Sequence, residues 1–240
     1  LNKHAMLYSS LLFSPCGSIR LSSRAQMGKK NKLTKFAEIG DFPNVYQRAE
    51  EMKGKWQTHF PKEQPLVLEL ACGKGEYTIG LAEMYPNRNY IGLDIKGNRI
   101  WKGARKGLDE NISNAAFLRC EINLIESYFE EGEIDEIWIT FPDPQHRKGK
   151  AKHRLIHPRF LDKYRKVGKK PLTINLKTDS TRYYKYCKEV IEEQKLQVLA
   201  DSDDVYAWAD RPAEINIRTF YESMWLDEGK KIKYLKFVLA

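Results

Sequence analysis

Short β-rich runs alternate with stretches of helical spacing from Pro65 onward, and this alternation restricts the fold more than any other feature. The predicted strands are 66–71, 90–95, 115–120, 136–141 and 172–177. The predicted helices, each lying between two strands, are 75–85, 97–110, 158–167 and 180–195. Because parallel strands need such helical connections, the chain is predicted to be an α/β protein with a doubly wound, mostly parallel sheet.

The C-terminal part departs from this alternation. The runs 197–201 and 231–238 read as strands without a long helix between them, which predicts an antiparallel hairpin at one edge of a seven-stranded sheet. A chain of 240 residues, 42% of them hydrophobic, can bury one sizeable core. Residues 36–240 are therefore predicted to form a single domain.

The first 35 residues differ in composition from the rest. They contain seven Lys or Arg and no Asp or Glu, which predicts a basic, disordered extension over 1–35. Met27, which precedes Gly28, Lys29 and Lys30, is a candidate natural start. The apolar run 6–13 leaves a targeting signal as the alternative interpretation.

Positive charge is concentrated in two stretches. Residues 145–170 hold eleven Lys or Arg against one acid, so this stretch and 1–35 leave the remainder of a chain of net charge +9 at −8. A focal excess of cations on a globular protein is typical of a surface that follows nucleic-acid phosphates. Solvated lysines that only aid solubility are the alternative.

Cysteine and hydropathy patterns exclude other classes of protein. The four cysteines form no CxxC pair, which argues against a zinc knuckle and for a reducing compartment, the cytoplasm: Cys16, Cys72, Cys120 and Cys187. No apolar run reaches the roughly 18 residues of a membrane helix. His153 and His157 lie four residues apart, but the surrounding cations argue against a metal site.

Acidic residues and glycines follow the predicted strands. Glu69 precedes Gly73 and Gly75 at a strand-to-helix turn, where glycines let the backbone approach a nucleotide-like cofactor. Thr78 stands where a nicotinamide-binding fingerprint has a third glycine, so an oxidoreductase is disfavoured. Asp94, nineteen residues after Gly75, can accept both hydroxyls of a ribose. A plain connecting turn is the alternative.

Two more acids follow later strands. Glu121 stands where it can meet an adenine amino group. Asp143 lies between Pro142 and Pro144 at the end of strand 136–141, directly before the basic loop. Carboxyl ends of parallel strands share one edge, so these acids are predicted to line one crevice. A proline-flanked surface turn is the alternative for Asp143.

The run Phe141-Pro142-Asp143-Pro144, followed by basic residues, closely resembles the FPDPWPKKRHxKRR signature of bacterial tRNA (guanine-N7)-methyltransferases. The loop from Glu69 to Gly75 resembles that of class I S-adenosylmethionine-dependent methyltransferases. Segments 53–56, 177–179 and 219–222 are similar to further family segments, and the resemblance spans roughly residues 45–238. It implies a Rossmann-like methyltransferase sheet, with tRNA as partner and no metal, acting as a monomer or a homodimer.

The resemblance also implies roles for individual residues. The cofactor-binding positions match Glu69, Gly73, Gly75, Asp94, Glu121 and Asp143, and the last is the implied catalytic residue. Substrate-binding positions match Arg147, Asp179, Thr219, Phe220, Tyr221 and Glu222. The implied reaction methylates N7 of guanine 46 in the tRNA variable loop, with Asp143, Asp179 and Glu222 accepting hydrogen bonds from guanine N1 and N2.

The chain departs from the family pattern at several positions. Gln145 replaces a usual tryptophan, Met224 a usual arginine and Glu121 a usual aspartate, while Gly149 and Lys150 stand where Arg-His is common. These departures bear on substrate docking more than on the cofactor site. A methyltransferase of another RNA position, a protein or a small molecule, and a non-catalytic RNA-binding module on the same fold, are the alternatives.

Overall fold

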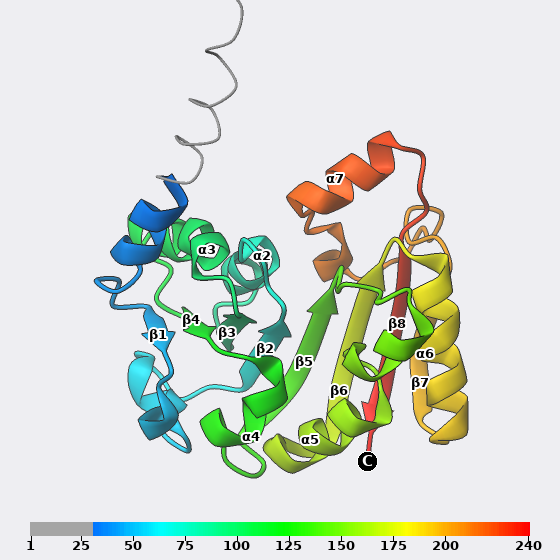
Figure 1. Ribbon diagram of the computed structural model, residues 1–240, viewed down its shortest axis with the longest axis horizontal. Coiled ribbons are helices and arrows are strands. Elements are labelled where there is room, and N and C mark those ends of the chain that lie inside the picture. The colour runs from blue at the N-terminus through cyan, green and yellow to red at the C-terminus, as the bar shows by residue number, and fades with distance from the viewer. Residues whose placement is uncertain (1–30) are drawn as a thin grey trace, which may run out of the picture.

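The computed structural model describes residues 31–240, which build one mixed sheet with helices on both faces (Figure 1). Its strands are β1 (Val45–Gln47), β2 (Leu66–Leu70), β3 (Asn89–Asp94), β4 (Ala115–Arg119), β5 (Ile134–Thr140), β6 (Gly168–Thr178), β7 (Gln197–Ser202) and β8 (Lys233–Leu239). Its helices are α2 (Glu76–Met84), α3 (Gly97–Asp109), α4 (Ile125–Tyr128), α5 (Pro158–Val167), α6 (Thr181–Glu193) and α7 (Phe220–Asp227).

The strand order is β1-β4-β3-β2-β5-β6-β8-β7, and every pairing is parallel except those of β8. This order confirms the doubly wound α/β sheet and the antiparallel edge. The sheet has one strand more than the seven predicted, because β1 pairs with β4 over only three residues, too few for an alternating pattern to show in the sequence. The strand order reverses direction between the neighbouring strands β2 and β5, which makes this boundary the topological switch point of the sheet.

Alternating side chains of the strands face two separate cores. Leu66, Leu68 and Leu70 of β2 pack with residues of α4, α5 and α6. Val67, between them, packs with residues of α2 and α3 on the other face. Because side chains alternate along a strand, Glu69 lies on the same face as Val67, toward α2.

The described chain begins with a helical segment. Residues 31–38 are helical and pack on α3, where the Trp101 ring donates a hydrogen bond to Glu38 (2.6 Å) and lies under the Lys35 ammonium group (4.3 Å). Ile39, which follows this helical segment, is fully buried. Residues 31–35 of the segment predicted to be disordered are thus helical here, with the Lys35 ammonium group over the Trp101 ring. Residues 1–30, including Met27, lie outside the described part.

Candidate active site

Two adjoining cavities open at the carboxyl ends of the strands, beside the β2–β5 boundary. The larger has a volume of about 1190 Å³ and the smaller about 400 Å³, and both are lined by Ala71, Asp94 and Ile95. Open α/β sheets bind ligands at this kind of topological switch point. The shared residues make the two cavities parts of one cleft.

The turn between β2 and α2 needs its two glycines for different reasons. Gly73 (φ +57°) and Gly75 (φ +67°) both adopt left-handed backbone conformations. A Cβ on Gly75 would lie 2.4 Å from the Phe117 ring, so this position packs against the core. A Cβ on Gly73 would meet only the Ala71 carbonyl oxygen, at 4.0 Å, so open space remains beside it for a ligand.

Glu69 is buried beneath this turn and lines neither cavity. Its carboxylate accepts hydrogen bonds from the Thr78 amide (2.8 Å) and from the hydroxyls of Thr78 and Thr140. Burial raises the pKa of Glu69 to about 7, although these hydrogen bonds oppose the rise. Glu69 therefore joins β2, α2 and β5 below the cleft instead of presenting a free carboxylate to it.

Asp94 and Glu121 lie on the cleft, as their strand ends predict. The Asp94 carboxylate accepts hydrogen bonds from the backbone amides of Gly73 (2.9 Å) and Lys96 (2.8 Å). These bonds fix the carboxylate at the mouth of both cavities. Glu121 is exposed and lines the smaller cavity together with apolar side chains, among them Ile122 and Phe160. The smaller cavity thus offers an apolar slot that two carboxylates, those of Asp94 and Glu121, also line.

The proline-flanked loop after β5 presents Asp143 to the larger cavity. The exposed Asp143 carboxylate also accepts the Gln145 amide (2.9 Å). The guanidinium of Arg154 donates to the carbonyls of Pro144 and Gln145 (3.2 Å each) and lies 4.2 Å above the Tyr186 ring. Arg154, only 7% exposed, therefore holds this loop in place from below.

The opposite wall of the larger cavity comes from β6 and α7. Asp179 follows β6, and Tyr221 and Trp225 project from α7. The first turn of α7 is held against the glycine turn, because the Phe220 amide donates to Glu76 (2.8 Å) and the Lys74 ammonium group lies 3.5 Å from the Phe220 ring. The walls that carry the glycine turn and the α7 aromatics are thereby connected.

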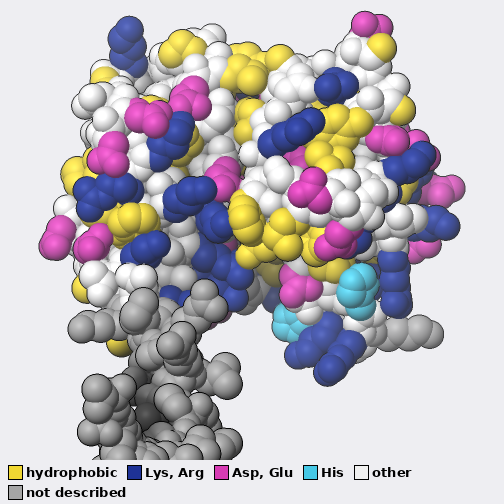
Figure 2. Space-filling model, turned by 90° about the horizontal axis from the view of Figure 1, so that it is seen from above, with side chains coloured by type: hydrophobic (Ala, Val, Ile, Leu, Met, Phe, Trp, Pro, Cys, Tyr) yellow, Lys and Arg dark blue, Asp and Glu magenta, His cyan; other side chains and the backbone are white. Residues whose placement is uncertain are grey.

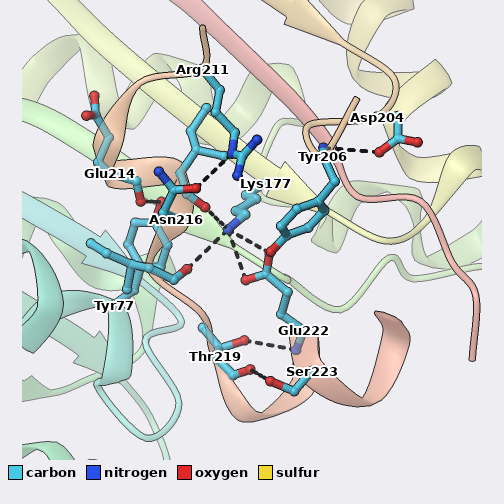
Figure 3. Close-up of polar contacts among 12 residues, drawn as sticks. Tyr77, Lys177, Asp204, Tyr206, Arg211, Glu214, Asn216, Thr219, Glu222 and Ser223 are labelled. Atoms are coloured by element: carbon cyan, nitrogen blue, oxygen red, sulfur yellow. Dashed lines mark hydrogen bonds and ion pairs between the residues drawn. The ribbon is translucent and has the colours of Figure 1, made fainter. Parts of the chain in front are cut away.

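A fully buried ion pair fixes the segment before α7 (Figure 3). The Lys177 ammonium group lies 2.7 Å from Glu222 and also donates to the carbonyls of Ile215 (2.7 Å) and Ile217 (3.2 Å). Lys177 contacts both oxygens of the Glu222 carboxylate, and the Tyr206 hydroxyl donates to Oε1 of Glu222 (2.9 Å). Burial lowers the pKa of Lys177, and the attraction of Glu222 opposes this shift.

Several expected substrate contacts occupy other places. Glu222 does not line the cleft, because Lys177 and Tyr206 take both of its oxygens. The Thr219 hydroxyl caps α7 by accepting the Glu222 amide (3.1 Å). Arg147 is exposed beside the larger cavity without lining it, and Phe220 is 50% exposed above the glycine turn. Asp94, Asp143, Asp179 and Tyr221 are the predicted residues that the larger cavity brings together.

The backbone conformations of two cleft residues and the position of Trp225 gave no signal in the sequence. Ala71 (φ +58°) and Phe141 (φ +48°) adopt left-handed conformations where β2 and β5 end, although such conformations are unusual for residues with side chains. Trp225 reaches the cavity only because α7 folds over it. Within residues 31–240 no group of three metal-binding side chains occurs, and no helix is long and apolar enough to cross a membrane.

Comparison with known proteins identifies a family for the chain. Residues 63–235 match a family model described as "Putative methyltransferase". The tRNA (guanine-N(7)-)-methyltransferase of Bacteroides thetaiotaomicron is 45% identical, over 88% of this chain and 86% of the relative. The protein of the same name from Porphyromonas gingivalis is 47% identical, over 85% of this chain and 86% of that protein.

Solved structures support the fold alone. A SAM-dependent methyltransferase from Aquifex aeolicus is similar with a TM-score of 0.51 at 16% identity, covering 80% of this chain and 90% of that one. The 16S rRNA methyltransferase KamB gives a TM-score of 0.57 at 12% identity, covering 78% of this chain and 92% of that one.

Proposed function

The chain belongs to the tRNA (guanine-N(7)-)-methyltransferase family, and on this premise we propose that it transfers a methyl group from S-adenosylmethionine to N7 of a guanine in tRNA. One observation supports this most directly: Asp94 and Asp143, from opposite sides of the β2–β5 boundary, line one cavity together with several cations. A carboxylate after β3 suits a ribose, and cations suit the phosphates of RNA.

The residues of the cleft fit this cofactor. Asp94 would accept hydrogen bonds from the ribose hydroxyls, and the apolar slot beside Glu121 would hold the adenine ring. The Glu121 carboxylate can accept a hydrogen bond from the adenine amino group. The open space at Gly73 would admit the methionine part against the backbone. When bound, S-adenosylmethionine supplies an electrophilic methyl group on a sulfonium. Glu69 would act indirectly, by holding the turn through Thr78 and Thr140.

The other side of the larger cavity would bind the guanine. N7 of guanine is unprotonated and nucleophilic at neutral pH, so alignment matters more than a strong base. Asp143 and Asp179 would accept hydrogen bonds from guanine N1 and N2, which selects guanine and stabilises the positive charge that N7 methylation creates. Tyr221 and Trp225 would stack on the base. Arg147, exposed beside the cavity, would contact a phosphate.

Two finer statements are also part of the proposal. The family resemblance suggests guanine 46 of the variable loop as the target. A reducing compartment, the cytoplasm, agrees with three cysteines of the described part, which are free and buried: Cys72, Cys120 and Cys187.

The test is to incubate the protein with labelled S-adenosylmethionine and unmodified tRNA, then cleave the tRNA specifically at N7-methylguanine. We expect one labelled site, and its loss when guanine 46 is replaced by adenine. The variant Asp143→Asn should lower kcat by about 10²-fold or more, because it removes the charge that faces the reacting base. Its tRNA affinity should stay close to that of the wild type.

The matched control is Asp162→Asn, since Asp162 is an exposed residue of α5 that pairs with Arg165. Label at another position would point to a methyltransferase of another RNA site. No saturable heat on titration with S-adenosylmethionine would point to a non-catalytic RNA-binding module. Unchanged turnover of Asp143→Asn would refute the role of Asp143.

A further inference from the structure

The cations of α3 divide into two groups. Beyond its first turn, each is paired with an acid: Lys102 with Glu76 (2.9 Å), Arg105 with Glu38 (3.7 Å) and Lys106 with Glu110 (3.0 Å). The two cations at its start, Lys96 and Arg99, have no ion pair with any residue of the described chain. Ion pairs that stabilise α3 therefore do not explain the presence of these two cations.

Lys96 and Arg99 line the larger cavity on the β3 side of the β2–β5 boundary. Lys185 lines the same cavity from α6, which follows β6 on the other side of that boundary, and it too has no acidic partner in the described part. Figure 2, which looks down on this face, shows a group of Lys and Arg side chains beside the central hollow. The cavity mouth therefore has unpaired positive charge on two opposite sides.

Unpaired cations held close together repel one another, and a polyanion that spans them relieves this repulsion and releases its own counterions. The loop after Asp143 supplies the cations that the sequence motif identifies, but they lie on the β5–β6 side of the cavity. A strand of RNA that places a base in the cavity continues past it in two directions. Its backbone must then also pass the β3 side, where Lys96 and Arg99 lie.

We propose that Lys96 and Arg99 each bind a backbone phosphate of the tRNA on the β3 side of the cleft, next to the nucleotide that is methylated. This subsite rests on the proposed function, since it takes the bound polyanion to be tRNA. It divides the tRNA contacts between two walls, so the target nucleotide is held by the phosphates on both of its sides. An Arg and a Lys suit this task, because a guanidinium binds two phosphate oxygens and an ammonium group adds a point charge.

The test measures the affinity of the full chain for unmodified tRNA between 50 and 200 mM salt. The variant Lys96→Gln/Arg99→Gln is compared with Lys106→Gln/Lys188→Gln, which loses the same charge at two exposed lysines that are already paired with acids. Losing two phosphate contacts should reduce the slope of log affinity against log salt by about 1.4 to 1.8. Raising the salt fourfold weakens the binding of both proteins, and the factor by which affinity falls should be roughly 7- to 12-fold smaller for the variant than for the wild type.

The control variant should keep the wild-type slope, and both variants should bind S-adenosylmethionine with wild-type affinity. Equal slopes for the two variants would overturn the proposal, because the effect would then be one of net charge. Weaker cofactor binding by Lys96→Gln/Arg99→Gln would also overturn it, by assigning the pair to the cofactor. Failure of the wild type to methylate tRNA would instead refute the proposed function, which the methylation assay detects separately.

Discussion

Removing the Lys177 ammonium group should destabilise the fold more than removing any exposed lysine. In Lys177→Met, the fully buried Glu222 loses a partner at 2.7 Å, and the carbonyls of Ile215 and Ile217 lose their shared donor. Breaking a buried pair on one side typically costs about 3 to 5 kcal/mol, because the remaining charge stays buried without compensation. That is a large part of a domain's usual stability of about 5 to 15 kcal/mol.

The assay is urea unfolding at pH 8, read from the midpoint at unchanged slope. Lys177→Met should lose about 3 kcal/mol or more. The double variant Lys177→Met/Glu222→Gln should recover at least about 2 kcal/mol, because it leaves no buried charge. The control is Lys188→Met, whose pair with Asp201 is partly exposed and is expected to contribute at most about 1 kcal/mol.

A cost below about 1 kcal/mol for Lys177→Met, or no recovery in the double variant, would refute the reasoning from burial. The double variant also tests the expected contact of Glu222 with guanine. If Glu222 acts by holding the segment before α7, the folded double variant should retain most of its methylation rate. If Glu222 touches the base, stability should recover without activity.

Three further predictions concern the cleft. Arg154→Lys should lower kcat with little loss of cofactor affinity in a methylation assay, because an ammonium group cannot both span two loop carbonyls and stack on a ring. Gly75→Ala should lower the melting temperature more than Gly73→Ala, because its Cβ would lie 2.4 Å from the Phe117 ring, whereas Gly73→Ala should mainly weaken cofactor binding in calorimetry. Glu69 has a folded-state pKa of about 7, above its ordinary value of 4.5, so its stabilising contribution is complete below pH 4.5 and is lost as the pH rises through 7. The melting temperature of Glu69→Gln, measured relative to that of the wild type, should therefore rise between pH 5 and pH 8.

The order of strands and helices could be predicted from local pattern. The alternation that begins at Pro65 predicted the parallel sheet, and the last two strands predicted the antiparallel edge. The three-residue strand β1 and the helix over 31–38 were missed, since each depends on a neighbour distant in sequence: β4 for the strand and α3 for the helix. A segment whose structure is decided by its partner carries too little periodicity to reveal it.

The pattern of strands and acids in the sequence predicted that Asp94, Glu121 and Asp143 lie at one edge, because parallel strands end on the same side of a sheet and each acid stands at a strand end. Which of the acids are available to a ligand depends on contacts between distant parts of the chain. Glu69 lies on the α2 face below the cleft, and Glu222 is buried against Lys177, 45 residues away in sequence. Spacing along a chain sets which side chains share a face, but burial and ion pairing arise from contacts between distant segments, which local spacing does not encode.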